Sequence, residues 1–329
     1  MPPLLSVRDL SVQFRTDEGQ ITAVENVSFD IAPGEVLGLV GESGSGKSVT
    51  AKALMRLNPG NTTYAPESRI VLHDDGRDVD VLALRRPRDL MVVRGGRVSM
   101  IFQEPMASFA PAITVGAQMV EQLLLHTDMT KRQARAHSID MLARVGIADP
   151  ARRVDQYAFE FSGGMRQRAM IAMALSTRPR LLIADEPTTA LDVTIQAQIL
   201  ALLREAQAEL GMALLLVTHD LGVVAEMADA VAVMYAGRVA EQAPADSLFD
   251  APAHPYSAGL LACLPRIERD AALAAIPGTV PPLSALPPGC AFAPRCTRAA
   301  PLCAVTRPDP RALDRGTWVA CHQPLRDDG

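Results

Sequence analysis

The residues with the clearest chemistry lie between positions 41 and 48. The segment Gly41-Glu42-Ser43-Gly44-Ser45-Gly46-Lys47-Ser48 matches the pattern G-x-x-x-x-G-K-[ST]. Its glycines let the backbone curl so that successive N–H groups point at one anion, and a following helix adds partial positive charge. The lysine of such a loop can reach the β- and γ-phosphates of a nucleotide, and the serine hydroxyl can ligate Mg²⁺. An apolar run precedes the segment, so we interpret it as a phosphate-binding loop (P-loop) and not as a flexible Gly/Ser turn.

Two strand ends carry a second set of polar side chains. The apolar run from Leu181 ends in Asp185 and Glu186, and like charges this close are costly unless a cation neutralises one of them. We assign Asp185 to Mg²⁺, through water, and Glu186 to polarising the attacking water; an exposed strand-end pair is the alternative. His219 follows another apolar run, where an imidazole could hydrogen-bond the γ-phosphate, although a histidine in such a place can also be structural.

A third polar segment opens a helix. Ser162 is placed as an N-cap, and the two glycines after it, Gly163 and Gly164, expose backbone donors. Taken alone, this pattern favours a helix cap with a glycine hinge. Considered with the P-loop, the segment at 162–164 is a second helix start able to bind an anion. Two such sites do not obviously serve one nucleotide.

The elements that must position these residues follow from hydrophobic patterning. Residues 4–14 and 21–31 alternate apolar and polar, which predicts an N-terminal β-hairpin. Short apolar runs at 35–40, 180–185 and 213–218 predict strands of a parallel sheet covered by helices on both faces. A helical block fills 105–179, with helices predicted over 115–125, 131–145 and 163–176, and a further helix over 48–57 after the P-loop.

Composition narrows the class of protein. The 329 residues are 48% hydrophobic with a formal charge of −5, which argues against a general nucleic-acid binder. No apolar run approaches the roughly 20 residues that span a bilayer. The first residues lack a charged segment followed by an apolar one, so we expect no secretory signal and a cytosolic protein.

The motifs together resemble the nucleotide-binding subunits of ABC transporters, over residues 4 to about 250. The P-loop, the segment 161–167, Asp185-Glu186 and His219 occur in that family's order and spacing. So do Gln103, within Ile101-Phe102-Gln103-Glu104-Pro105, and Asp192, within Ala190-Leu191-Asp192. The resemblance implies an α/β fold, the P-loop NTPase ABC cassette, with a parallel-sheet core, an N-terminal antiparallel β subdomain and a helical subdomain at about 105–179.

The resemblance also implies roles for individual residues. Two such domains pack head to tail, so the signature of one closes on the γ-phosphate held by the P-loop of the other; this explains the spare anion site. Glu186 and His219 are the implied catalytic residues, and Asp192 communicates across the dimer. ATP contacts are implied for Phe14 (which stacks on adenine), Gly41, Glu42, Ser43, Gly44, Ser45, Gly46, Lys47, Ser48 and Val49. Mg²⁺ is implied at Ser48, Gln103 and Asp185, and the signature contacts in trans at Ser162, Gly163, Gly164 and Met165.

Departures from the family pattern are modest. Phe161 and Met165 stand where leucine and glutamine are usual in the signature, and Phe109-Ala110 stands where Leu-Asn is usual after Gln103. None of these changes removes a group with an implied catalytic role.

The chain beyond residue 251 has a different character. Prolines are dense there, which excludes long helices and central strands, and all five cysteines lie there. Four follow the spacing Cys290-x5-Cys296-x6-Cys303-x17-Cys321, and Cys263 stands apart. A reducing cytosol disfavours structural disulfides, which leaves a metal site or free thiols. Zinc sites more typically use tight C-x2-4-C pairs, whereas wider spacing suits an iron–sulfur cluster.

The tail also narrows the resemblance. His254-Pro255-Tyr256 and the segment 287–296 resemble the C-terminal extension of the oligopeptide/dipeptide importer branch. Dipeptide-type subunits of that branch are associated with a [4Fe–4S] cluster, so the resemblance implies one on Cys290, Cys296, Cys303 and Cys321. Zinc and free thiols stay open, and His322 is a possible substitute ligand.

The expected function follows from the resemblance. We expect an ABC ATP-binding domain over 1–254 and an extension over 255–329. The protein would use ATP and Mg²⁺ to power import of peptides from the cytoplasmic face of the membrane. Expected partners are a second ABC ATPase (a paralogue in this branch), two permeases and an extracytoplasmic binding protein, and no nucleic acid. The alternatives are another solute such as nickel, a soluble ABC ATPase acting on nucleic acid or ribosomes, and a largely structural subunit.

Overall fold

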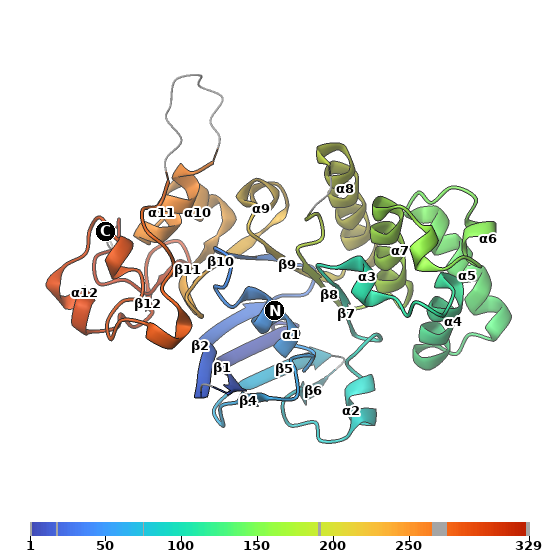
Figure 1. Ribbon diagram of the computed structural model, residues 1–329, viewed down its shortest axis with the longest axis horizontal. Coiled ribbons are helices and arrows are strands. Elements are labelled where there is room, and N and C mark those ends of the chain that lie inside the picture. Colours follow the sequence, from blue (N-terminus) through green and yellow to red (C-terminus); the bar gives the residue numbers. More distant parts are fainter. Residues whose placement is uncertain (1, 18, 75, 190–191, 265–274, 327–329) are drawn as a thin grey trace. The chain divides into compact units, whose positions relative to one another are not determined.

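The computed structural model describes residues 2–17, 19–74, 76–189, 192–264 and 275–326. The chain forms two compact units, one made of residues 1–82 and 216–329 and the other of residues 83–215. Figure 1 follows the chain through both units from the N-terminus to the C-terminus. No helix in the described part of the chain is long and apolar enough to cross a membrane.

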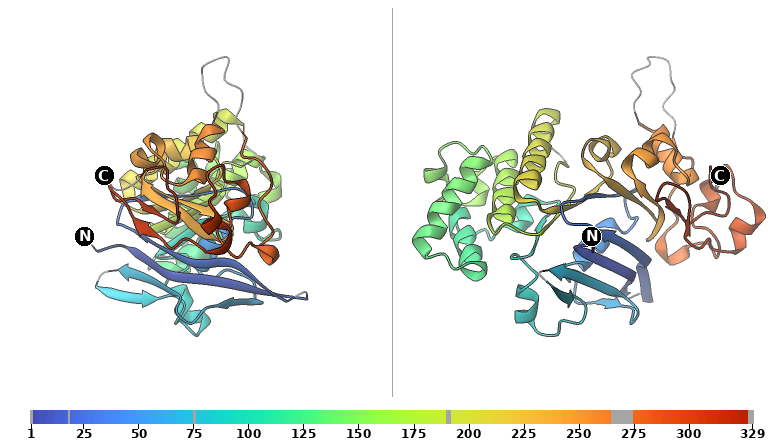
Figure 2. Two further views of the ribbon diagram at one scale, coloured as in Figure 1. Left: turned by 90° about the vertical axis from the view of Figure 1, so that its left-hand side faces the viewer. Right: turned by 180° about the vertical axis from the view of Figure 1, so that it is seen from behind.

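The first unit begins with an antiparallel sheet. Strand β1 (Leu5–Thr16) pairs with β2 (Gly19–Ile31), and this confirms the predicted N-terminal hairpin. The sheet order is β2-β1-β5-β6, with β4 also paired to β1, and the strands are visible from behind in Figure 2. The remaining bounds are β4 Thr62–Tyr64, β5 Arg69–Asp74 and β6 Arg77–Asp80.

A second, mixed set of strands carries the P-loop. Strand β3 (Val36–Val40) is completely buried and runs parallel to β10 (Ala230–Tyr235). Strand β11 (Arg238–Pro244) is antiparallel to β10, so the sheet is not purely parallel as predicted. The cause is the short turn after β10, where Ala236 and Gly237 adopt positive φ and return the chain at once.

The helices of the first unit are short. Helix α1 (Lys47–Ala53) ends earlier than the predicted residue 57, because Arg56 turns to a left-handed φ of 51°.

Strand β9 (Ala213–Thr218) includes residues of both units and is completely buried, as predicted. The other helices before the tail are α9 Leu221–Met227 and α10 Ala245–Asp250.

The C-terminal tail adds to the edge of β11. Residue Glu241 pairs with Val319 and Gln242 with Trp318, and the backbone N–H of Ala320 donates to Ala240. The tail contains only short elements, as its proline content predicts. They are α11 Pro255–Ala262, the 3₁₀ turns η2 Leu283–Ala285 and η3 Ala293–Arg295, α12 Pro301–Val305, β12 Arg311–Ala312 and β13 Trp318–Val319.

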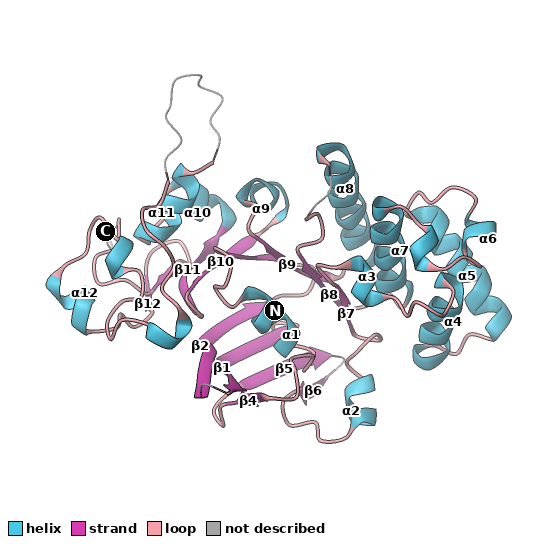
Figure 3. Ribbon diagram, viewed as in Figure 1, coloured by secondary structure: helices cyan, strands magenta, loops and turns pink. Residues whose placement is uncertain are grey.

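The second unit is mostly helical (Figure 3). Its three longest predicted helices are confirmed as α4 Val115–His126, α5 Lys131–Arg144 and α7 Gly163–Ser176. Each begins at a hydroxyl side chain that accepts a backbone N–H, which satisfies one donor of the helix start. The other elements are α2 Pro87–Met91, β7 Val98–Ile101, α3 Pro105–Ser108, α6 Pro150–Arg153, η1 Ala158–Glu160, β8 Leu181–Asp185 and α8 Val193–Leu210.

The strands of the second unit are buried and parallel. Strand β7 pairs with β8 in parallel register from Val98 opposite Leu181 to Ile101 opposite Ala184. Every residue of β8 is buried, and its last residue, Asp185, is 2% exposed. The apolar strand therefore ends by placing a buried carboxylate at its carboxyl end, where α/β sheets place ligands.

Candidate functional site

The P-loop occupies the turn between β3 and α1, and its shape depends on glycine. Gly41, Gly44 and Gly46 have φ values of 149°, 77° and 98°. A Cβ at Gly41 would lie 2.1 Å from the carbonyl oxygen of Met234, so a side chain is excluded there. Only backbone can pass this point, which is what a loop that wraps a phosphate requires.

Lys47 folds back over this loop. Its Nζ donates to the carbonyl oxygens of Gly41 at 2.8 Å and Glu42 at 2.9 Å, and lies 3.4 Å from Oγ of Ser45. The residue is 6% exposed. A buried ammonium held by loop carbonyls supplies positive charge at the place where the backbone curls, and phosphate oxygens are stronger acceptors than carbonyl oxygens. The donor set therefore suits a polyphosphate.

The loop is supported from the turn between β10 and β11. The N–H of Gly237 donates to the carbonyl of Ser45 at 3.0 Å. Ser43 and Gly44 are exposed, whereas Ser48 and Val49 are half-buried at the start of α1.

The other two residues predicted for the nucleotide site lie outside the P-loop. Phe14 is half-buried on β1, where its backbone is paired with Ile21 and Thr62. His219 is exposed directly after β9, next to Asp220, which caps α9.

In the second unit, the Glu186 carboxylate accepts hydrogen bonds from two polar side chains. Its Oε2 accepts from Nε2 of Gln103 at 2.9 Å and from Oγ1 of Thr189 at 2.8 Å. Its φ of 50° is left-handed, which costs a non-glycine residue free energy and is typical of functional turns. The structure thus brings Gln103 and Glu186 together, and Asp185 is adjacent in sequence.

The signature segment lies at the start of α7 in the same unit. Oγ of Ser162 accepts from the N–H of Met165 at 3.3 Å, as expected of an N-cap, and Gly163 is exposed. Gln167, one turn further on, donates to the carbonyl of Pro187 at 2.5 Å. This hydrogen bond links the signature helix to the residue after Glu186. Asp192 caps α8 by accepting from the N–H of Ile195; residues 190 and 191 lie outside the described residues.

The four predicted ligand cysteines share one small pocket. Cys290, Cys296, Cys303 and Cys321 all line it, together with His254 and His322, whereas Cys263 does not. The N–H of Cys290 donates to the carbonyl of Cys303 at 2.8 Å, which holds two of them close in space. Nε2 of His322 is 2.9 Å from the carbonyl of Thr306.

The cysteines of this pocket form no disulfide bonds. Burial raises the pKa of Cys290 and Cys296, and raises that of Cys321 to about 11, and neighbouring thiols add to each shift. Among the described residues, no three or more His, Cys, Asp or Glu side chains are grouped so as to hold a metal ion. The four cysteines therefore line one pocket, but the prediction of a metal or iron–sulfur site is not confirmed.

The tail also supplies residues that the sequence motifs did not assign to the nucleotide site. Tyr256 and Arg295 both contact Glu42 of the P-loop. The available signal was the presence of Tyr256 and Arg295 in the tail segments 254–256 and 287–296, but nothing in the sequence indicates their partner. His254 caps α11 by accepting the N–H of Tyr256 on Nδ1, and burial lowers the pKa of His254 to about 4, so its ring is neutral.

Comparisons with known proteins agree with this arrangement. Residues 24–189 match the family described as ABC transporter, and residues 240–303 match the family described as oligopeptide/dipeptide transporter, C-terminal region.

The chain belongs to the ABC transporter family. It is 50% identical over 307 residues to a putative peptide import ATP-binding protein of Brucella abortus (strain 2308), covering 93% of this chain and 91% of that one. It is 48% identical over 326 residues to the oligopeptide transport ATP-binding protein OppD of Salmonella typhimurium, covering 98% and 95%. Among solved structures, cbiO1 of Clostridium perfringens, part of an ABC transporter complex, is similar with a TM-score of 0.61 and 27% identity, covering 76% of this chain and 92% of that one.

As a member of the ABC transporter family, the chain has the P-loop NTPase fold and is an ATPase. The predicted fold class is therefore confirmed, with the mixed sheet as its one difference. The match to the second family begins within β11 and includes α11, η3 and Cys303.

Proposed function

We propose that this protein is the ATP-hydrolysing subunit of a peptide importer. The observation that carries this proposal is the similarity to a protein named for oligopeptide transport over 98% of this chain, the tail included. A general ABC ATPase would share the cassette alone. The relatives named above do not favour nickel, nucleic acid or ribosomes as the alternative.

The residues of the first unit would bind the nucleotide. The P-loop from Gly41 to Val49 supplies backbone donors, and Lys47 transfers its hydrogen bonds from loop carbonyls to the β- and γ-phosphates. Phe14 would stack on adenine, and His219 would hydrogen-bond the γ-phosphate. The buried position of Lys47 supports this assignment because a buried ammonium needs a strong acceptor.

The residues of the second unit would serve hydrolysis. Bound Mg²⁺ would neutralise phosphate charge, and its predicted oxygen ligands are Gln103 and Asp185 of this unit and Ser48 of the first. Glu186 would orient and polarise the attacking water, with Gln103 and Thr189 fixing its carboxylate. The signature residues Ser162, Gly163, Gly164 and Met165 would act on a nucleotide bound by a partner ATPase, and Asp192 would link the two.

The partners and location follow from the same proposal. The chain would lie at the cytoplasmic face of the membrane beside two permeases and a second, paralogous ATPase, with an extracytoplasmic protein that binds the solute. We propose domain limits of 1–254 for the ATPase and 255–329 for the extension.

The proposal is tested by transport. When the chain is reconstituted in vesicles with its partner ATPase and permeases, and with the binding protein added outside, we expect uptake of labelled oligopeptides that requires ATP enclosed in the vesicle. Nickel uptake under the same conditions serves as the control for another solute. Uptake of nickel without peptide, or no uptake with intact ATP hydrolysis, contradicts the peptide assignment.

We also propose that the four-cysteine pocket holds a [4Fe–4S] cluster. The support is that four cysteines, the number of ligands such a cluster takes, line one pocket. Their side chains would have to move closer together to share a metal, because the described residues do not form such a group. In that state the four sulfurs would be thiolates, and the cluster would tie together segments of the tail that contain little regular structure.

Anaerobically purified protein is expected to be brown and to contain about four irons per chain by metal analysis. Cys303→Ser should lose the colour and most of the iron because it removes a pocket sulfur, whereas Cys263→Ser should keep both. A colourless sample without iron contradicts the proposed cluster. If that sample contains one zinc per chain, the pocket is instead a zinc site.

A further inference from the structure

The C-terminal tail contacts the P-loop through one arginine. Nη1 and Nη2 of Arg295 donate to Oε2 and Oε1 of Glu42 at 2.6 and 3.0 Å, a bidentate pair. The Arg295 side chain is 4% exposed and that of Glu42 is 30% exposed. Bidentate arginine–carboxylate pairs are directional, so this contact sets the orientation as well as the position of Glu42.

The tail and strand β10 together hold the guanidinium of Arg295. Its Nε donates to the carbonyl of Pro277 at 2.9 Å. The rings of Tyr235 and Phe292 lie 5.8 and 6.0 Å from its Cζ, within cation–π distance. The arginine is thus fixed before it reaches Glu42, and the pair transmits the position of the tail to the loop.

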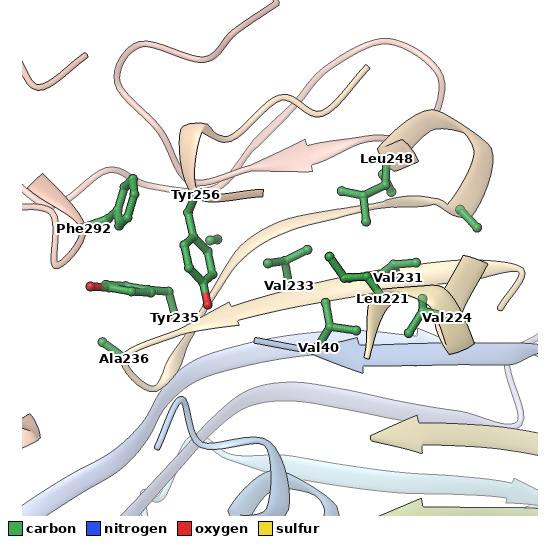
Figure 4. Close-up of a cluster of buried hydrophobic side chains, with 13 residues drawn as sticks. Val40, Leu221, Val224, Val231, Val233, Tyr235, Ala236, Leu248, Tyr256 and Phe292 are labelled. Carbon is green, nitrogen blue, oxygen red and sulfur yellow. The ribbon is translucent and has the colours of Figure 1, made fainter. Parts of the chain in front are cut away.

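A second contact holds the backbone of the same residue. The N–H of Glu42 donates to the Tyr256 hydroxyl at 2.9 Å, and Tyr256 is completely buried. Figure 4 shows Tyr256 packed with Tyr235 and Phe292, and the ring centroids of these three lie 4.7 to 5.3 Å apart. The carboxylate and the backbone N–H of Glu42 are therefore both held by the tail, while its carbonyl accepts from Lys47 within the loop.

The position of Glu42 in turn affects Lys47. The Lys47 ammonium donates to the carbonyl of Glu42 and to that of Gly41. A rotation of the peptide at Glu42 would move an acceptor of the ammonium and change the curl of the loop. The chain of contacts runs from the tail through Glu42 to the cation at the centre of the P-loop.

We propose that Arg295 is a positioning residue for the nucleotide site, which through Glu42 holds the P-loop in its phosphate-binding shape. This inference rests on the proposed role of the P-loop in binding ATP. A preformed loop loses less conformational entropy when it binds, so the contribution falls on nucleotide affinity. The hydrolysis step itself uses other groups and is affected little.

The test measures nucleotide affinity of the full-length chain with a fluorescent ATP analogue. For Arg295→Met we expect the Kd to rise about tenfold, because the loop must then be ordered by the nucleotide. In the assembled transporter the KM for ATP should rise in parallel, while kcat at saturating ATP stays within about threefold. Arg295→Lys keeps the charge but not the bidentate geometry and should recover part of the affinity.

A double-mutant cycle separates positioning from general stability. Glu42→Gln should raise the Kd about as much as Arg295→Met, and the double variant should be no weaker than either, because both act through one contact. In thermal unfolding, Glu42→Gln should be the least stable because it leaves a buried arginine unpaired, and adding Arg295→Met should restore stability. Independent, multiplying effects on Kd would overturn the proposal.

Two controls make the outcome decisive. Arg307→Met removes another ion pair between tail and body, at Glu25, which keeps its second partner Arg238. Its Kd should be unchanged; an equal rise would show that any loosening of the tail suffices, and would overturn the specific role of Arg295. The role of Arg295 would also be overturned if both Arg295 variants keep the native Kd while Lys47→Met abolishes binding. If Lys47→Met itself retains ATP binding, the result contradicts the proposed function.

Discussion

Replacing Glu186 with glutamine is expected to stop ATP turnover while leaving nucleotide binding intact. The substitution keeps the size of the side chain and an oxygen that can accept from Gln103 and Thr189, so the local structure should persist. It removes the negative charge that polarises the attacking water. Loss of a general base costs about 10² to 10⁴ in rate. Phosphate release by the assembled transporter measures the turnover, and retention of radiolabelled ATP measures binding.

Thr189→Val serves as the matched control for this prediction. It removes one hydrogen bond to the same carboxylate without removing the charge, so we expect a loss of no more than about tenfold in kcat. Near-normal hydrolysis in Glu186→Gln would contradict the catalytic role of Glu186. Glu186→Gln should also accumulate the ATP-bound form, which a misfolded protein could not do.

Replacing Lys47 with methionine is expected to abolish nucleotide binding. Methionine fills a similar volume, but it supplies no charge and no donor to the phosphates. The native ammonium is buried and already desolvated, so its attraction to a polyphosphate is weakly screened by water. We expect the Kd for ATP to rise at least about a hundredfold, measured by equilibrium binding to the full-length chain.

Arginine at position 47 would test the geometry of the same site. Lys47→Arg keeps the charge, but its planar guanidinium is larger than the ammonium and cannot occupy the same point between the carbonyls of Gly41 and Glu42. Its affinity should fall between those of the native chain and Lys47→Met. Binding of ATP by Lys47→Met with native affinity would contradict the assignment of the loop.

Much of the site could be predicted from sequence because its parts are local. The strand before Gly41, the N-cap at Ser162 and the carboxylates after β8 each depend on neighbours a few residues away, and the structure has them as expected. The helix after the P-loop was predicted too long because nothing in the sequence marks Arg56 as left-handed. The mixed sheet was missed because it depends on one tight turn after β10.

The contact between Arg295 and Glu42 could not be predicted in this way. The two residues are 253 positions apart, and nothing near either of them in the sequence indicates the pair. The convergence of four cysteines was inferred from their number, yet their spacing alone leaves zinc, a cluster and free thiols open. Long-range partners of polar residues are set by tertiary packing, which local pattern does not encode.

The position of Arg295 near the C-terminus has a consequence for biosynthesis. A growing chain emerges from the ribosome with Glu42 well before Tyr256 and Arg295, so its nucleotide loop exists for most of translation without either partner. Domains generally fold as units during synthesis, beginning at the N-terminus. Here the nucleotide loop is completed by residues 214 and 253 positions further along the chain. A message cut short before codon 255 would therefore yield a chain with an intact nucleotide motif but with an unsupported loop.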